Sequence, residues 1–298
     1  MAVFKNERLS PREEKVMSRL RDMYRSMSEE RNEIQDLIDE VQEYFRPYRL
    51  ASMFSDGHNL KSGAKIYDGE PIAAKNRLSA GFFAWLISPS LDWLQFEPPR
   101  DFTKSQMRVA RMYCDELERF VYDSFRDNNF YEQVALAIDE EVTCGTVAMI
   151  AENNPKLDQT NFTTLAINDF LNSDDRYGVS DTLIRRVKMR QRNLVAMFPE
   201  QFDSREREKL LRDGEKMCEI LHFIYPAIEG DKFFGVHEYA SVYTYSPNVS
   251  SDGILGSRAS KLLSERGMMY KPFAVGKGEE IPGHSCGGAA TFNALYDA

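Results

Sequence analysis

The chain has 298 residues, of which 42% are apolar and 12% aromatic, enough for a sizeable core in one or two domains. This composition argues against a disordered chain. The 38 basic and 47 acidic residues give a net charge of −9, which excludes an overall basic field for wrapping nucleic acid.

Two amphipathic helices are predicted at the start of the chain. The pattern Ser-Pro-Arg-Glu at 10–13 is typical of a capped helix start. Apolar residues then recur every three or four positions to Met27, and a second helix is predicted over 29–45, ended by Pro47. Their narrow apolar stripes favour an edge of the fold or a contact with a neighbouring subunit. A loop is expected over 51–64.

Residues 66–101 are predicted to form the buried centre of the fold. They contain both tryptophans, Trp85 and Trp93. Apolar and small residues at helical spacing predict a helix over 72–86, and 92–97 predicts a short strand. On this interpretation, replacing Trp85 or Leu86 by Ala costs about 2–5 kcal/mol.

Two more helices are predicted after residue 101, followed by a change from helical to strand-like patterns. Helical periodicity covers 105–126 and 131–143, and Gly145 is expected to supply a left-handed C-terminal cap. Strands are predicted over 147–151, 163–167 and 181–187, as one small antiparallel sheet, followed by short helices over 192–198 and 204–212. Longer strands are predicted over 217–225 and 233–245, while 261–270 fits either strand or helix.

The expected fold class is therefore α+β, with long N-terminal helices before a mainly antiparallel β region. We expect a mainly helical region over 1–145 and a mixed β region over 146–298. Residues 291–298 are predicted to be the first turns of a helix, so we expect the chain to be part of something longer.

The cysteines and the apolar runs indicate the cellular compartment in which we expect the protein. Four cysteines are scattered without a CxxC pair, which predicts buried thiols in a reduced compartment. The N-terminus shows no signal-peptide pattern, and the longest apolar run, 82–87, is too short to span a bilayer. We expect a soluble intracellular product with no membrane role.

His222 and His237 are the strongest metal candidates. They fall on strands predicted to be adjacent, and Glu219 or Glu238 could supply a third ligand. Strand histidines are more often surface or half-buried groups, which is the favoured interpretation here.

Other chemical patterns are weaker. The run Gly-Lys-Gly-Glu at 276–279 lacks the first glycine and the hydroxyl of a phosphate-binding loop. Ser285 and Cys286 show no nucleophile elbow, and His284 with Cys286 is a weak metal pattern. His58 has no partner pattern. We therefore predict no catalytic, cofactor-binding or metal residues and no enzymatic activity.

Charged clusters leave two alternatives open. The carboxylates at 139–141, and Asp174 with Asp175, are predicted to be solvated faces. A metal-dependent hydrolase using Asp174, Asp175, His222 or His237 is the less favoured alternative. The basic cluster from Arg185 to Arg192 could form a nucleic-acid-binding module, although alternation on a strand splits it between two faces. A second basic cluster lies at 205–209.

Several stretches, taken in order, resemble one protein family. They are ERNEIQDLIDE at 30–40 with YFRP at 44–47, IYDG at 66–69, LSAG at 78–81, SPSLDW at 88–93, NFY at 129–131, CGTVAM at 144–149, NDF at 168–170, DRYG at 175–178, RR at 185–186, PFAV at 272–275 and AL at 294–295. In this order they resemble the podovirus head-to-tail connecting proteins, the portal proteins, over nearly the whole chain.

The resemblance implies a structural role. It implies a subunit of a dodecameric ring at one capsid vertex, through which a separate terminase motor packages double-stranded DNA and through which the DNA later leaves. Implied partners are the capsid, a tail adaptor and the terminase, and the implied location is the virion, with the host cytoplasm during assembly. The chain would be the outer, wing-like part of the subunit, truncated before the channel-forming helices. We expect neighbouring subunits to pack through 10–45 and 105–126.

Overall fold

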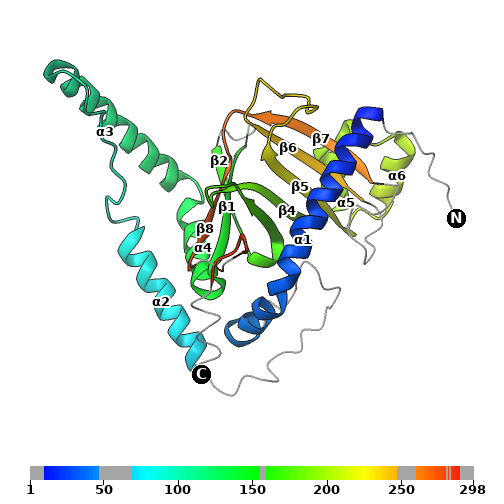
Figure 1. The fold of residues 1–298 in the computed structure, drawn as a ribbon, viewed down its shortest axis with the longest axis horizontal. Coiled ribbons are helices and arrows are strands. Elements are labelled where there is room, and N and C mark those ends of the chain that lie inside the picture. Colours follow the sequence, from blue (N-terminus) through cyan, green and yellow to red (C-terminus); the bar gives the residue numbers. More distant parts are fainter. Residues whose placement is uncertain are drawn as a thin grey trace.

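The computed structural model describes residues 10–46, 69–154, 159–246, 260–279, 281 and 283–288. Its fold is α+β, as the sequence predicts, with long helices before antiparallel sheets (Figure 1). The expectations for Pro47, His58, the loop at 51–64 and the helix at 291–298 lie outside the described residues. The helices are α1 (Pro11–Phe45), α2 (Glu70–Leu86), α3 (Lys104–Asp127), α4 (Phe130–Cys144), α5 (Gln191–Met197) and α6 (Ser204–Arg212).

Two antiparallel sheets form the body. One has three strands in the order β2-β1-β8, and the other has five in the order β3-β4-β5-β6-β7. The strands are β1 (Thr146–Asn154), β2 (Gln159–Leu165), β3 (Phe170–Asp174), β4 (Ser180–Arg190), β5 (Met217–Pro226), β6 (Tyr239–Tyr245), β7 (Lys261–Met268) and β8 (Phe273–Lys277).

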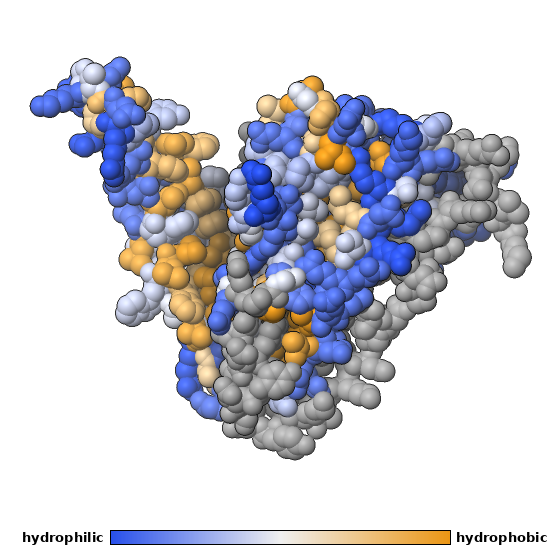
Figure 2. All heavy atoms as spheres, in the orientation of Figure 1, coloured by the Kyte–Doolittle hydropathy of each residue, from blue (hydrophilic) through white to orange (hydrophobic). Residues whose placement is uncertain are grey.

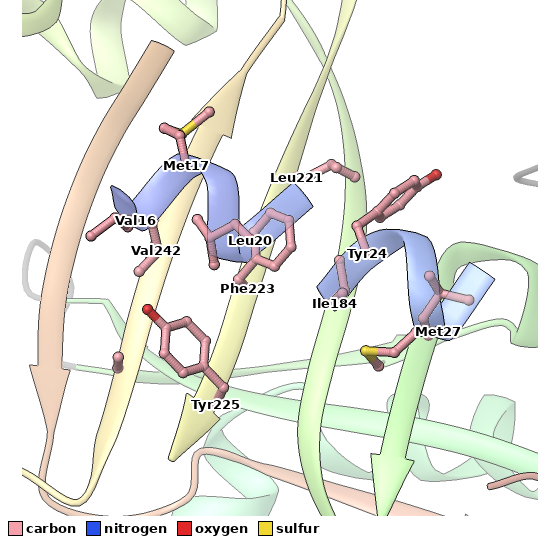
Figure 3. Packing of buried hydrophobic residues seen from close by; sticks show 12 residues of the cluster. Val16, Met17, Leu20, Tyr24, Met27, Ile184, Leu221, Phe223, Tyr225 and Val242 are labelled. Atoms are coloured by element: carbon pink, nitrogen blue, oxygen red, sulfur yellow. The ribbon is translucent and has the colours of Figure 1, made fainter. Parts of the chain in front are cut away.

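The first helix, α1, lies across one face of the five-stranded sheet. Its buried residues Val16, Leu20 and Tyr24 pack against Phe223 and Tyr225 of β5, as Figure 3 shows. Because side chains alternate along a strand, Phe223 and Tyr225 face α1 while their neighbours face the opposite side of the sheet. The core is thus shared between α1 and the strands. The division into domains at 145/146 stays a prediction.

The prediction of two helices over 10–45 is wrong, because α1 is continuous for 35 residues. Ser28-Glu29 looks like a new start in the sequence. Neither proline nor glycine interrupts the chain there, and the buried stripe continues in phase through Met27, Arg31 and Ile34. The capping box at Ser10 and Glu13 is confirmed, with both reciprocal hydrogen bonds present.

The opposite face of the five-stranded sheet has two covers. Near β1 and β8 the three-stranded sheet packs on it through Ile150 and Phe273 against Leu183 and Ile224. Further along, α5 packs on it through Leu194. The predicted three-strand sheet of 147–151, 163–167 and 181–187 is therefore only half right. The first two strands pair with each other, but the third is β4 of the larger sheet.

The turn after α4 confirms the sequence prediction. Gly145 has a φ of 67°, and its N–H donates to the carbonyl of Glu141. A side chain there would also collide with the backbone of Gly288. Residues 261–268 prove to be strand β7, whereas 233–238 form a turned segment before β6 rather than part of a strand.

Candidate assembly surface

Helix α2 contradicts the prediction of a buried centre. Its buried residues are the polar Lys75 and Ser79. The apolar residues Phe82, Trp85 and Leu86 are exposed, Trp85 to 83%. The predicted strand over 92–97 is also wrong, because this segment is irregular. Helical periodicity correctly identified a helix with apolar residues at regular spacing, but in this single chain those residues are left largely uncovered.

Buried ionic contacts hold α2 in this orientation. Asp139 of α4 accepts hydrogen bonds from Lys75 at 2.6 Å and Ser79 at 3.2 Å, and it pairs with Arg46. Arg46 also pairs with Glu140 at 2.6 Å. Burial alone would raise the pKa of Asp139, but the bond from Lys75 and the charge of Arg46 hold that pKa below its usual value. The expectation that 139–141 is a solvated face is therefore wrong for Asp139 and Glu140.

An aromatic cluster joins the following segment to α3 and α4. The Trp93 ring stacks on Phe125 and Phe130, with centroids 5.9 and 6.0 Å away, and meets Tyr122 edge-on. The Tyr122 hydroxyl accepts from the N–H of Leu94 at 2.6 Å. The two tryptophans thus have different surroundings, since Trp93 is half-buried and Trp85 is exposed.

Residues 70–127, which we call the arm, project away from the two sheets (Figure 1). Figure 2 shows apolar surface gathered over it. On α3 the exposed apolar residues include Val109, Met112, Tyr113 and Phe120, the last to 71%. A monomeric soluble protein rarely leaves such a contiguous apolar surface uncovered. The arm is therefore a candidate contact surface for another protein chain.

The candidate metal histidines lie apart. His222 is opposite Tyr243 in the pairing of β5 with β6, whereas His237 lies before β6 and packs on Phe233. His222 is fully buried, with Nδ1 accepting from Arg185 at 2.9 Å and Nε2 bonded to Ser241 at 2.8 Å. Burial, and then the Arg185 charge, lower the pKa of His222 well below its usual value. His222 is thus a satisfied core group.

The proposed hydrolase carboxylates have structural partners. Asp174 accepts from Ser180 at 2.7 Å and pairs with Lys277, and Asp175 accepts the N–H groups of Tyr177 and Val179 in the turn. Within the described ranges, no group of three or more His, Cys, Asp or Glu side chains is arranged to hold a metal ion.

The basic cluster at 185–192 is partly paired with acids. Arg185 is buried and pairs with Glu152 at 2.5 Å, between the two sheets. Arg186 and Lys188 lie 3.7 and 3.6 Å from Glu219, and Arg190 and Arg192 both pair with Glu215. These five cations share three carboxylates, so the pairing reduces the positive charge offered to a phosphate backbone without removing it. In the second cluster, Arg207 donates to the carbonyl of Pro199.

The structure also shows the surroundings of the weak metal pattern formed by His284 and Cys286. His284 lies 3.8 Å from Glu33 of α1, and Cys286 is buried beside the same helix. No helix of the described residues combines the length and apolar character needed to cross a membrane. Sequence reasoning missed the Asp139 cluster, since nothing in the local pattern signals that Lys75 and Arg46 meet there.

A body of packed sheets with an exposed apolar arm beside it is typical of a structural protein that assembles with other chains. The comparisons with known proteins agree with that class. The chain matches the bacteriophage head to tail connecting protein family over residues 17–289, and it belongs to that family. Its role is therefore that of a structural connector of a bacteriophage. No curated protein matches it.

Proposed function

We propose that the chain is a subunit of a portal ring at one capsid vertex, through which double-stranded DNA is packaged and later leaves. The observation that carries this proposal is the family match over residues 17–289. Capsid and tail adaptor proteins hold the ring, and a separate terminase drives the DNA. The protein works in the virion after assembly in the host cytoplasm, as a podovirus component and not as an enzyme.

Two physical features support a ring. The arm exposes Phe82, Trp85 and Phe120 in the single chain, and a neighbouring copy at each position of a ring would cover it. The net charge of −9 suits a passage that does not grip DNA, since a basic lumen would bind phosphates and slow their movement.

The direct test is assembly of the purified chain. Native mass spectrometry and electron microscopy should show a closed ring with a central opening, of twelve subunits by the family resemblance. A chain that stays monomeric at high concentration, alone and with capsid and tail proteins, would refute the proposal.

The nucleic-acid-module alternative has its own test. Binding of short DNA duplexes to the dissociated subunit should be weak even at low salt, where phosphate contacts are strongest. Tight binding that is lost in Lys188→Glu/Arg190→Glu would favour the alternative instead.

A further inference from the structure

The N-terminal end of α3 is apolar and basic on its outside. Phe102, Met112 and Tyr113 are exposed there. A shallow hollow is lined by three apolar side chains, three cations and one acid: Phe102, Met107, Met112, Lys104, Arg108, Arg111 and Asp115. Among the described residues, no other element of the chain is packed over this end of the helix (Figure 1).

The cations at this end of α3 interact unfavourably with the helix dipole. Lys104, Arg108 and Arg111 are all exposed and follow one another at intervals of four and three residues, so they lie on one face. The first turn of α3 contains no acidic residue. Because the N-terminus of a helix carries partial positive charge, these cations raise the energy of the isolated helix. An anionic partner would reverse that cost.

The outer face of α1 shows the opposite pattern. Glu29, Glu33, Asp36 and Glu40 are exposed and lie at intervals of four, three and four residues. Like charges at these spacings repel each other. Glu29 pairs with Arg25 at 2.9 Å and Glu33 lies 3.8 Å from His284, whereas the C-cap Arg46 pairs with Asp139 and Glu140. Burial, and then the charge of Asp36, raise the pKa of the neighbouring Asp39. Within the described part of the chain, Asp36 and Glu40 are therefore the exposed acids of this face that remain without an ion pair.

We propose that the N-terminal face of α3 in one copy docks on the outer face of α1 in a second copy. Arg108 and Arg111 pair with Asp36 and Glu40, and Met112 packs beside the exposed Tyr44. This inference rests on the proposed ring and names its contact. The two surfaces differ, so the contact is heterologous, and repeating it closes a ring when the rotation between copies fits. The helix α3 projects away from its own body, which suits a contact with another copy (Figure 1).

Charge reversal and charge exchange test the pairing in the full chain. The first variant is Arg108→Glu/Arg111→Glu, the second is Asp36→Lys/Glu40→Lys, and the third combines all four substitutions. Juxtaposed like charges should raise the dissociation constant between subunits by about tenfold or more in each double variant. The combined variant should recover most of the lost association, because its charges are complementary again.

A matched control for the α3 variant changes the total charge by the same amount as that variant. Arg205→Glu/Lys216→Glu reverses two exposed cations elsewhere on the body, Arg205 being in the first turn of α6. This control should assemble like the original chain. Thermal unfolding of each dissociated subunit checks that every variant is folded.

The outcomes distinguish a failure of the proposed contact from a failure of the proposed ring. An original chain that forms no oligomer refutes the proposed function. A ring that tolerates both reversals refutes only the contact. Loss in the α3 variant with no effect of the α1 variant indicates that α3 contacts another surface of the neighbouring copy and overturns the pairing. Loss in both without recovery in the combined variant also overturns it.

A cross-link tests the same contact without a change of charge sign. Both chains carry Cys114→Ser, because the half-exposed Cys114 lies one turn from position 111. A chain with Arg111→Cys is then mixed with a chain with Asp36→Cys under mild oxidation. A disulfide between the two chains, absent when either variant is oxidised alone, is expected. Mixed rings without this disulfide would overturn the proposal.

Discussion

Replacing Trp85 by Ala tests whether this side chain belongs to the buried core of the subunit or to a surface that another chain covers. Surface substitutions change stability by about 0.5 kcal/mol or less, so the free energy of unfolding of the dissociated subunit should hardly change. An indole offers about 150–250 Å² of surface, and at about 25 cal/mol per Å² covering its exposed 83% is worth roughly 3–5 kcal/mol at most. Because association also costs entropy, we expect a loss of about 2–3 kcal/mol in assembly, a roughly 30- to 150-fold rise in the dissociation constant.

The assay pairs urea unfolding of the dissociated subunit with sedimentation of the assembled protein. Leu20→Ala is the control for burial, since Leu20 of α1 is 0% exposed against the sheet and its truncation should lower the free energy of unfolding by about 2–5 kcal/mol. The reasoning is refuted when Trp85→Ala destabilises the subunit as much as Leu20→Ala does, or when it leaves assembly unchanged.

Three further predictions follow from the buried groups and the arm. Burial and the adjacent Arg185 lower the pKa of His222. Below about pH 6.5 the unfolded state therefore binds a proton that the folded state does not. As the pH falls further, the free energy of unfolding should fall by up to about 1.4 kcal/mol per pH unit. Urea titrations should show this slope, and His222→Gln should remove it. Gly145→Ala should lower the melting temperature, because the left-handed backbone alone costs about 1–2 kcal/mol with a side chain and the facing backbone leaves no room. Burial raises the pKa of Cys144 to about 12, so maleimide should label the half-exposed Cys114 first, and assembly should protect Cys114 if its part of the arm is covered.

Local signals predicted local structure well. The Ser10–Glu13 capping box marked the start of α1, and Gly145 marked the end of α4, because each depends on a few neighbouring backbone groups. The apolar run over 217–225 was likewise predicted to be a strand, and β5 spans Met217–Pro226. In each case the physical cause acts within a few residues of the signal.

The predictions that failed concern contacts between residues that lie far apart in the sequence. The periodicity of α2 shows that Trp85 and its neighbours need cover, but not whether the same chain provides it. The Asp-Glu-Glu run at 139–141 has the composition of a solvated face, yet Lys75 and Arg46 reach it from far along the chain. Equally, Arg185 reads as one of a basic cluster until Glu152 of another sheet is seen beside it.

The position of α2 leaves apolar surface uncovered in the single chain. Burying Lys75 against Asp139 takes charge out of water, which costs free energy that a well-placed pair only partly offsets. Phe82 lies seven residues after Lys75, on the same side of the helix, yet it is 44% exposed, and Trp85 is 83% exposed. The hydrophobic stabilisation that these side chains could give is therefore not obtained within the subunit. We infer that it is obtained when a neighbouring chain covers the arm, so that assembly, and not the folding of one chain, completes the burial of this helix.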